Sequence, residues 1–271
     1  ASSVLLAVAL GTLSWVTGAT TVAGIGASAD AIPQAVWLVG AGGLLLAAMI
    51  QSALVPFHTW LLSSMTAPTP ASALMHAGFV NAGGILLARF APVVTVDPTV
   101  MLVIVVVGAA SALAGKLLKA VQSDVKGRLG CSTTGQMGFM IAQAGLGFFG
   151  AAVTHLILHG FYKAYLFLAS GSQVEHTSPT AKGADAGLPG PVGGVVTVLT
   201  AVAGGALFAL LTGKGTHLGS GLLLTGLVTL TTLHAVQTVV GKTALPATVR
   251  YGLAPLVFLL AIAVYAAVYT A

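Results

Sequence analysis

The chain has very little charge. Of its 271 residues, ten are lysine or arginine and five are aspartate or glutamate, whereas 57% are hydrophobic. Soluble domains carry about a quarter charged residues, so a water-exposed globular surface cannot be built from this composition. The sequence therefore predicts an integral membrane protein.

Cysteine and the common catalytic motifs are also scarce. The single cysteine, Cys131, excludes an internal disulfide and a thiolate metal cage. No Walker loop, dinucleotide fingerprint or serine nucleophile elbow occurs, so we expect no catalytic site and an energy supply from an ion gradient or a partner. The basic residues are not gathered with aromatic residues in a groove, and nucleic acid is not an expected partner.

Apolar runs long enough to cross a bilayer recur along nearly the whole chain. We expect an all-α bundle of about nine transmembrane helices, at residues 2–18, 34–55, 69–92, 98–121, 129–147, 149–172, 188–212, 217–240 and 247–270. Prolines at 56, 68 and 70 and the polar run 122–128 predict at least one broken helix. Residues 1–176 should form the main transmembrane core, residues 177–191 a polar loop and residues 192–271 the C-terminal transmembrane helices.

Three titratable side chains recur at four-residue spacing inside one apolar run: His155, His159 and Lys163. On a helix they fall within roughly an 80° arc and stack along about 12 Å of axis, so they share one face. Titratable groups at membrane depth are costly and generally line an ion path. Because imidazole exchanges protons near physiological pH, this histidine–lysine ladder predicts a proton relay. The alternative is a set of polar core residues satisfied by neighbouring carbonyls or hydroxyls.

The one dense cluster of charge begins at Lys116 and includes Lys126. Lys126 lies at the predicted helix break, just before a hydroxyl-rich stretch with Ser132 and Thr133 that can hold water between two hydrophobic elements. We count these four residues among the expected ion-pathway residues. For other basic residues of the cluster, a cytoplasmic loop that follows the positive-inside tendency is an equal alternative.

His76 lies in a further apolar run with Ser72 and Asn81. It fits an ion gate and a packed polar bridge equally well, and we include it among the pathway candidates. His155 and His159 also have the i, i+4 spacing with which two histidines chelate zinc or iron. No third ligand is evident nearby and the adjacent lysine would repel a cation, so we expect no cofactor in this chain.

The order of these motifs resembles the proton-translocating antiporter-like family, which includes large membrane subunits of respiratory complex I and the Mrp cation/proton antiporters. The resemblance is carried by residues 56–61, 67–77, 122–126 and 132–140 and by the helix with the ladder. It covers about residues 35–176, and the remainder matches only in hydropathy. It implies an antiporter-like fold with the ion path on these residues.

Residues 76–84, 143–147 and 170–172 are more similar to the DabB branch of that family. DabB proteins are membrane subunits of inorganic carbon accumulation systems, paired with a large peripheral zinc subunit, DabA, that resembles a carbonic anhydrase. The resemblance implies a proton- or sodium-conducting subunit in the cell membrane that drives the partner's conversion of CO2 to bicarbonate. The zinc would belong to the partner, and lipids would surround this chain.

One position departs from the family pattern. The helix before Pro56 usually carries a buried lysine, and its place is taken here by Gln51. Glutamine cannot supply the charge that pairs with an upstream glutamate, so the resemblance leaves a simplified conduit through the ladder and Lys126. Two alternatives stay open: a subunit of a respiratory NADH-quinone oxidoreductase or Mrp antiporter, and a membrane scaffold that has lost transport.

Overall fold

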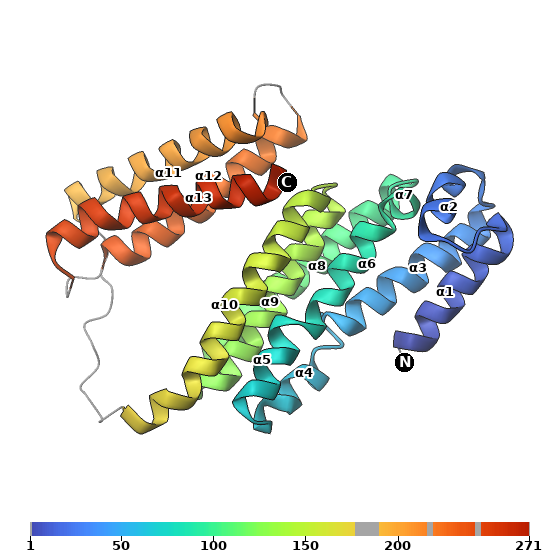
Figure 1. The fold of residues 1–271 in the computed structure, drawn as a ribbon, viewed down its shortest axis with the longest axis horizontal. Helices are drawn as coiled ribbons and strands as arrows, with labels where there is room; N and C mark the ends of the chain where they lie inside the picture. The colour runs from blue at the N-terminus through green and yellow to red at the C-terminus, as the bar shows by residue number, and fades with distance from the viewer. Residues whose placement is uncertain (1, 177–189, 216–218, 242–244, 271) are drawn as a thin grey trace. The chain divides into compact units, whose positions relative to one another are not determined.

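The computed structural model describes residues 2–176, 190–215, 219–241 and 245–270. Every regular element in these ranges is helical, which confirms the predicted all-α fold. The chain separates into two compact units, Ala1–His176 and Thr177–Ala271, and both are helical bundles (Figure 1). Most of the predicted polar loop 177–191 lies outside the described residues.

Helices occupy all nine predicted transmembrane positions. The first unit contains α1 (Ser2–Thr17), α2 (Val22–Ala27), α3 (Gln34–Gln51), α4 (Thr59–Ser63), α5 (Thr69–Ala77), α6 (Ala82–Arg89), α7 (Ala91–Val94), α8 (Pro98–Val121), α9 (Val125–Gly145) and α10 (Phe149–His176). The second contains α11 (Pro191–Thr212), α12 (Ser220–Val240), the π-helical turn Val249–Leu253 and α13 (Ala254–Thr270).

Six helical spans of the described residues are long and apolar enough to cross a membrane. They are Gln34–Gln51, Thr69–Arg89, Pro98–Val121, Pro191–Thr212, Gly221–Val240 and Val249–Thr270. The remaining three predicted positions are α1, which is shorter, and α9 and α10, which carry the polar residues of the candidate site. The polar site is therefore concentrated on two long adjacent helices.

Local chemistry explains where α8 and α9 begin. The Asp97 carboxylate accepts a hydrogen bond from the Thr99 backbone N–H at 2.6 Å, and Pro98 occupies the first turn of α8. The Asp124 carboxylate accepts one from the Gly127 backbone N–H at 2.5 Å at the start of α9. The polar run 122–128 is thus a helix stop followed by an N-cap, which confirms the predicted break.

The segment that follows α3 is irregular, as the prolines predict. Ala53 has a positive φ of 51°, and the Ser52 hydroxyl donates to the Val80 carbonyl at 2.6 Å. The Trp60 indole N–H donates to the Ile50 carbonyl at 2.9 Å, which ties the short helix α4 back to the end of α3. The two bonds satisfy the Ile50 carbonyl at the end of α3 and the Val80 carbonyl in the turn after α5.

A further interruption divides the predicted run 69–92 and was not predicted. Between α5 and α6 the chain makes a 3₁₀ turn, Phe79–Asn81. The Asn81 side-chain amide donates to the Ala77 carbonyl at 2.6 Å and so satisfies the end of α5. At the C-cap of α5, the Gly78 backbone N–H donates to the Leu74 carbonyl, and the interruption follows directly. His76 consequently lies at the C-terminal end of a short helix.

Small residues bring neighbouring helices into backbone contact. A Cβ atom added at Gly115 of α8 would collide with the backbone of Gly135 on α9, and one added at Gly83 of α6 would lie 2.5 Å from the Ala48 carbonyl oxygen of α3. Membrane helices associate by this kind of close packing because lipid supplies no hydrophobic driving force.

Candidate functional site

The ladder is enclosed between α10 and its neighbours. Lys163 is 1% exposed, His159 is 5% exposed, and His155 is half-buried. Lys163 contacts Leu129 near the start of α9, and His155 contacts Gln143 near its end. The two helices are therefore antiparallel (Figure 1), and the ladder lies between the Leu129 and Gln143 levels of α9.

A neutral oxygen holds the lysine of the ladder. The Lys163 ammonium donates to the Leu129 backbone carbonyl at 3.0 Å. The Thr133 hydroxyl donates to the same carbonyl at 3.1 Å. Burial of an ammonium without a hydrogen-bond partner would cost several kcal/mol. The shared carbonyl reduces that cost, and within the described residues it replaces the carboxylate that commonly pairs with a buried lysine.

The opposite end of the ladder is held by an amide. His155 Nδ1 lies 3.1 Å from Gln143 Oε1, and the Gln143 side chain is 5% exposed. The rings of Phe139 and His155 lie 5.6 Å apart. The ring centroids of His155 and His159 are 5.9 Å apart, so the two imidazoles are neighbours on α10.

His76 brings α5 to the same region. Its ring is stacked on Phe167 at a centroid separation of 4.3 Å and an interplanar angle of 23°, and Phe167 lies one helical turn beyond Lys163 on α10. His76 is fully buried. Neither ring nitrogen of His76 or His159, nor the Thr134 hydroxyl, has a hydrogen-bond partner among the described residues. Buried polar atoms need such partners, so these are the atoms at which water can bind.

The remaining predicted pathway residues are more dispersed. The Lys126 ammonium donates to the Ala67 carbonyl at 2.5 Å, in the loop that precedes α5. Ser132 is half-buried on α9, and Lys116 is exposed on α8. The structure thus brings His76 and Thr133 to the ladder and places Lys126 against the α4–α5 connection. It leaves Lys116 on the surface of this unit.

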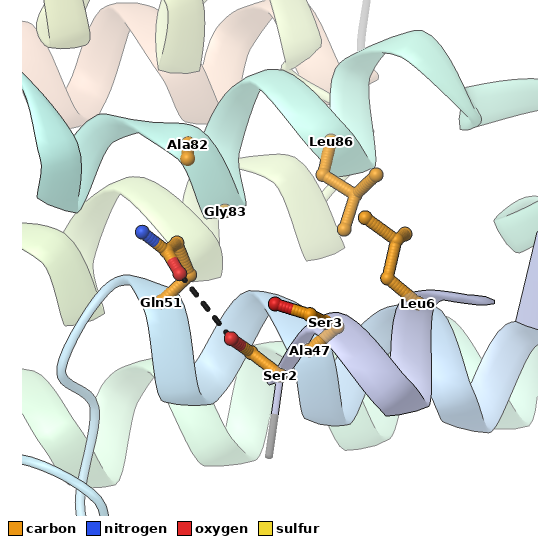
Figure 2. Close-up of a pocket in the computed structure, with 8 residues that line it drawn as sticks. All are labelled: Ser2, Ser3, Leu6, Ala47, Gln51, Ala82, Gly83 and Leu86. Atoms are coloured by element: carbon orange, nitrogen blue, oxygen red, sulfur yellow. Dashed lines mark hydrogen bonds between the residues drawn. The ribbon is translucent and has the colours of Figure 1, made fainter. Parts of the chain in front are cut away.

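Gln51 lines a separate cavity. The cavity has a volume of about 180 Å³ and is lined by Ser2, Ser3, Leu6, Ala47, Gln51, Ala82, Gly83 and Leu86. The Ser2 hydroxyl donates to Gln51 Oε1 at 3.4 Å, and Leu6 and Leu86 extend toward each other at one side (Figure 2). Every polar side chain in this lining is neutral, so the cavity offers oxygen atoms but no charge.

Sequence reasoning did not include two buried polar side chains of α9, Gln143 and Thr134, among the pathway residues, although Thr134 belongs to the hydroxyl-rich stretch that it singled out. Both lie in a membrane-length helix and are buried, so the cost argument that singles out the histidines applies to them too. Within the described residues, no group of three or more His, Cys, Asp or Glu side chains is arranged to hold a metal ion.

The bundle of long apolar helices defines a multi-pass integral membrane protein, and its interior encloses several titratable side chains. The model of the NADH:quinone oxidoreductase/Mrp antiporter transmembrane family matches residues 1–245. The chain belongs to this family, as the order of motifs predicts.

Individual relatives fall in two branches. The chain is 53% identical over 129 residues to "Probable inorganic carbon transporter subunit DabB1" of Halothiobacillus neapolitanus, an alignment that covers 48% of this chain and 23% of that protein. It is 42% identical over 167 residues to NADH-quinone oxidoreductase subunit L of Mycobacterium tuberculosis, covering 60% of this chain and 25% of that protein. The DabB resemblance drawn from the motifs is thereby confirmed.

The fold is also similar to that of a solved complex. A chain in the structure of the Mrp complex from Dietzia sp. matches with a TM-score of 0.64 and 26% identity, covering 99% of this chain and 32% of that chain. The matched parts therefore span about a quarter to a third of the length of these three proteins.

Proposed function

We propose that the chain is part of a subunit that conducts protons, or sodium ions, and couples their gradient to inorganic carbon uptake. The observation that carries the proposal is the ladder. Three titratable groups follow one another along the axis of α10, and within the described residues Lys163 is held by a carbonyl rather than by a carboxylate. Such a lysine can release and regain a proton without the loss of an ion pair.

The proposed path uses the groups that surround the ladder. Protons enter near Lys126, pass along the hydroxyl-bearing face of α9 that includes Ser132 and Thr133, and reach Lys163 and His159. Water bound at the open nitrogens of His159 and His76 would bridge the gaps between side chains. The membrane potential and the pH gradient drive the protons inward, and their movement biases an element that faces the partner.

The coupling to carbon uptake rests on the relatives. The DabB1 relative is named as an inorganic carbon transporter subunit, and its aligned identity is higher than that of subunit L. The partner we propose is a large peripheral DabA-like subunit, which would form a hetero-oligomeric complex with this subunit at the cell membrane. Zinc, when bound in that partner, would activate the water that hydrates CO2. This chain would supply the proton movement and no ligand to the metal.

A second candidate is a proton-pumping subunit of a respiratory NADH-quinone oxidoreductase or an Mrp antiporter. It is favoured by the subunit L relative and by the Mrp structure. Purification of the intact complex from native membranes separates the two candidates, because the first predicts one large soluble partner with stoichiometric zinc. Hydrophobic sister subunits, with or without redox centres, would favour the second.

The decisive variant is Lys163→Met in the intact complex. We expect it to reduce gradient-dependent bicarbonate accumulation at least about tenfold, as loss of a proton-transfer group does. Lys214→Met is the control, because Lys214 is exposed in the second unit, outside the proposed path. Undiminished accumulation by Lys163→Met, at equal expression and assembly, would refute the route and favour a scaffold that has lost transport.

A further inference from the structure

The contact between Gln143 and His155 defines the protonation pattern of one ring of the ladder. An amide oxygen accepts hydrogen bonds and never donates them. His155 Nδ1 lies 3.1 Å from Gln143 Oε1, so this geometry requires the hydrogen of the neutral ring to be on Nδ1. The lone pair is then on Nε2, the one ring atom left to take up a further proton.

The surroundings of His155 make this bond the main polar restraint on the ring. From α9, the packed neighbours are the Phe139 ring and the Gln143 amide. From α10, the titratable neighbour is His159, one turn along the helix. Gln143 is 5% exposed, so water competes little for its oxygen. Neither neighbour on α9 can accept a proton from His155.

We propose that Gln143 is a positioning residue that fixes His155 as the Nδ1–H tautomer and makes it the closed end of the ladder. This inference rests on the proposed proton conduction. A proton that arrives at Nε2 forms an N–H bond and converts the ring to imidazolium. The Nδ1 proton has no base beyond it, so the same Nε2–H bond breaks when the proton leaves. His155 stores a proton and returns it toward His159.

The position of Gln143 and His155 in the fold explains why a closed end would matter. Gln143 lies two residues before the end of α9, and His155 lies within the first two turns of α10. The pair therefore lies near the end of the helix hairpin. If His155 could pass a proton onward there, the path would open to the outside of the bundle at that end. An amide at this point accepts the hydrogen bond without passing the proton on, and so prevents an uncoupled leak.

The tautomer is measured directly in the intact complex, uniformly labelled with ¹⁵N-histidine. A spectrum of the wild-type protein minus that of His155→Asn isolates the His155 signals. We expect the one-bond ¹⁵N–¹H coupling on Nδ1. The coupling on Nε2 would overturn the proposal, and this measurement needs no variant at Gln143.

Two substitutions test the role of the amide. Gln143→Leu removes the acceptor, and we expect the His155 signal to shift toward the Nε2–H tautomer. Gln143→Glu retains an acceptor, so Nδ1–H should persist, but its carboxylate can take that proton as Nε2 receives another. Passive proton leak into vesicles loaded with a pH dye should then rise several-fold. Gln237→Leu, on α12 of the other unit, is the matched control.

The outcomes separate the inference from the function on which it rests. An unchanged tautomer in Gln143→Leu, or no added leak in Gln143→Glu, would refute the closed end while leaving conduction through Lys163 intact. Whether the ladder conducts protons is tested by Lys163→Met alone. If that variant retains full activity, an Nδ1–H signal at His155 does not restore the proposed conduction.

Discussion

Lys163 on α10 and Thr133 on α9 donate to one and the same acceptor, the backbone carbonyl of Leu129, at 3.0 and 3.1 Å. The two side chains are therefore held close to each other although they are 30 positions apart in the sequence. A hydroxyl at this point can accept a proton from the Lys163 ammonium group, or return one to the neutral amine that remains.

Thr133→Val tests this relationship. Valine keeps the β-branched shape but removes the donor, so we expect proton flux into vesicles to fall several-fold and the free energy of unfolding to fall by about 1 kcal/mol. Thr231→Val is the control, because the Thr231 hydroxyl makes an equivalent bond to the Leu227 carbonyl at 2.9 Å on an exposed face. Equal flux in both variants would remove Thr133 from the path.

His76→Phe separates the stacking of His76 from its nitrogens. Phenylalanine preserves the stack on Phe167 and removes two buried nitrogens that have no partner among the described residues. The thermal midpoint should therefore stay constant or rise, whereas proton flux should fall at least about tenfold. Phe167→Leu is expected to do the opposite: the midpoint falls and conduction persists. A His76→Phe protein with full flux would make His76 a packing residue.

Gly115→Ala tests the contact between α8 and α9. Its Cβ would collide with the backbone of Gly135, so the helices must separate, at a cost of about 1–3 kcal/mol in unfolding free energy. Gly42→Ala on α3 meets nothing within 4 Å and should be neutral or stabilising by up to about 1 kcal/mol. The comparison is made by thermal unfolding in detergent, and equal midpoints would contradict the close packing.

Gln51→Leu tests whether the cavity of Figure 2 belongs to the proton path. Glutamine cannot carry a proton, and its bond from Ser2 is long at 3.4 Å. We expect proton flux to be unchanged and the unfolding free energy to fall by at most about 0.5 kcal/mol. A large loss of flux would instead assign the cavity a hydrated role in conduction, which leucine would block.

Hydropathy alone predicted the positions of the helices, because a membrane span needs a long apolar run whatever its tertiary partners. The prolines and the polar run predicted the breaks at Pro56 and at residues 122–128, where proline and an Asp N-cap act locally. The turn between α5 and α6 was missed because no proline marks it. The Asn81 side chain that satisfies the end of α5 is an ordinary polar residue in the sequence.

For the candidate site, sequence spacing placed His155, His159 and Lys163 on one helix face, since that depends only on helical geometry. Their assignment to an ion path stays a prediction. Spacing could not supply the Leu129 carbonyl or the Gln143 amide, because these contacts depend on the antiparallel register of α9 and α10. This register is decided by tertiary packing between the two helices, and no local pattern specifies it.

The ladder is lined by carbonyl and amide oxygens, and this limits how many charges it can hold. The ring centres of His155 and His159 are 5.9 Å apart, and two positive charges about 6 Å apart repel by about 3 kcal/mol at an effective dielectric constant of about 20. Protonation of one ring therefore makes protonation of the other about a hundredfold less favourable. The histidine pair should therefore hold a single added proton, and proton uptake by this end of the ladder should saturate at one proton per pair.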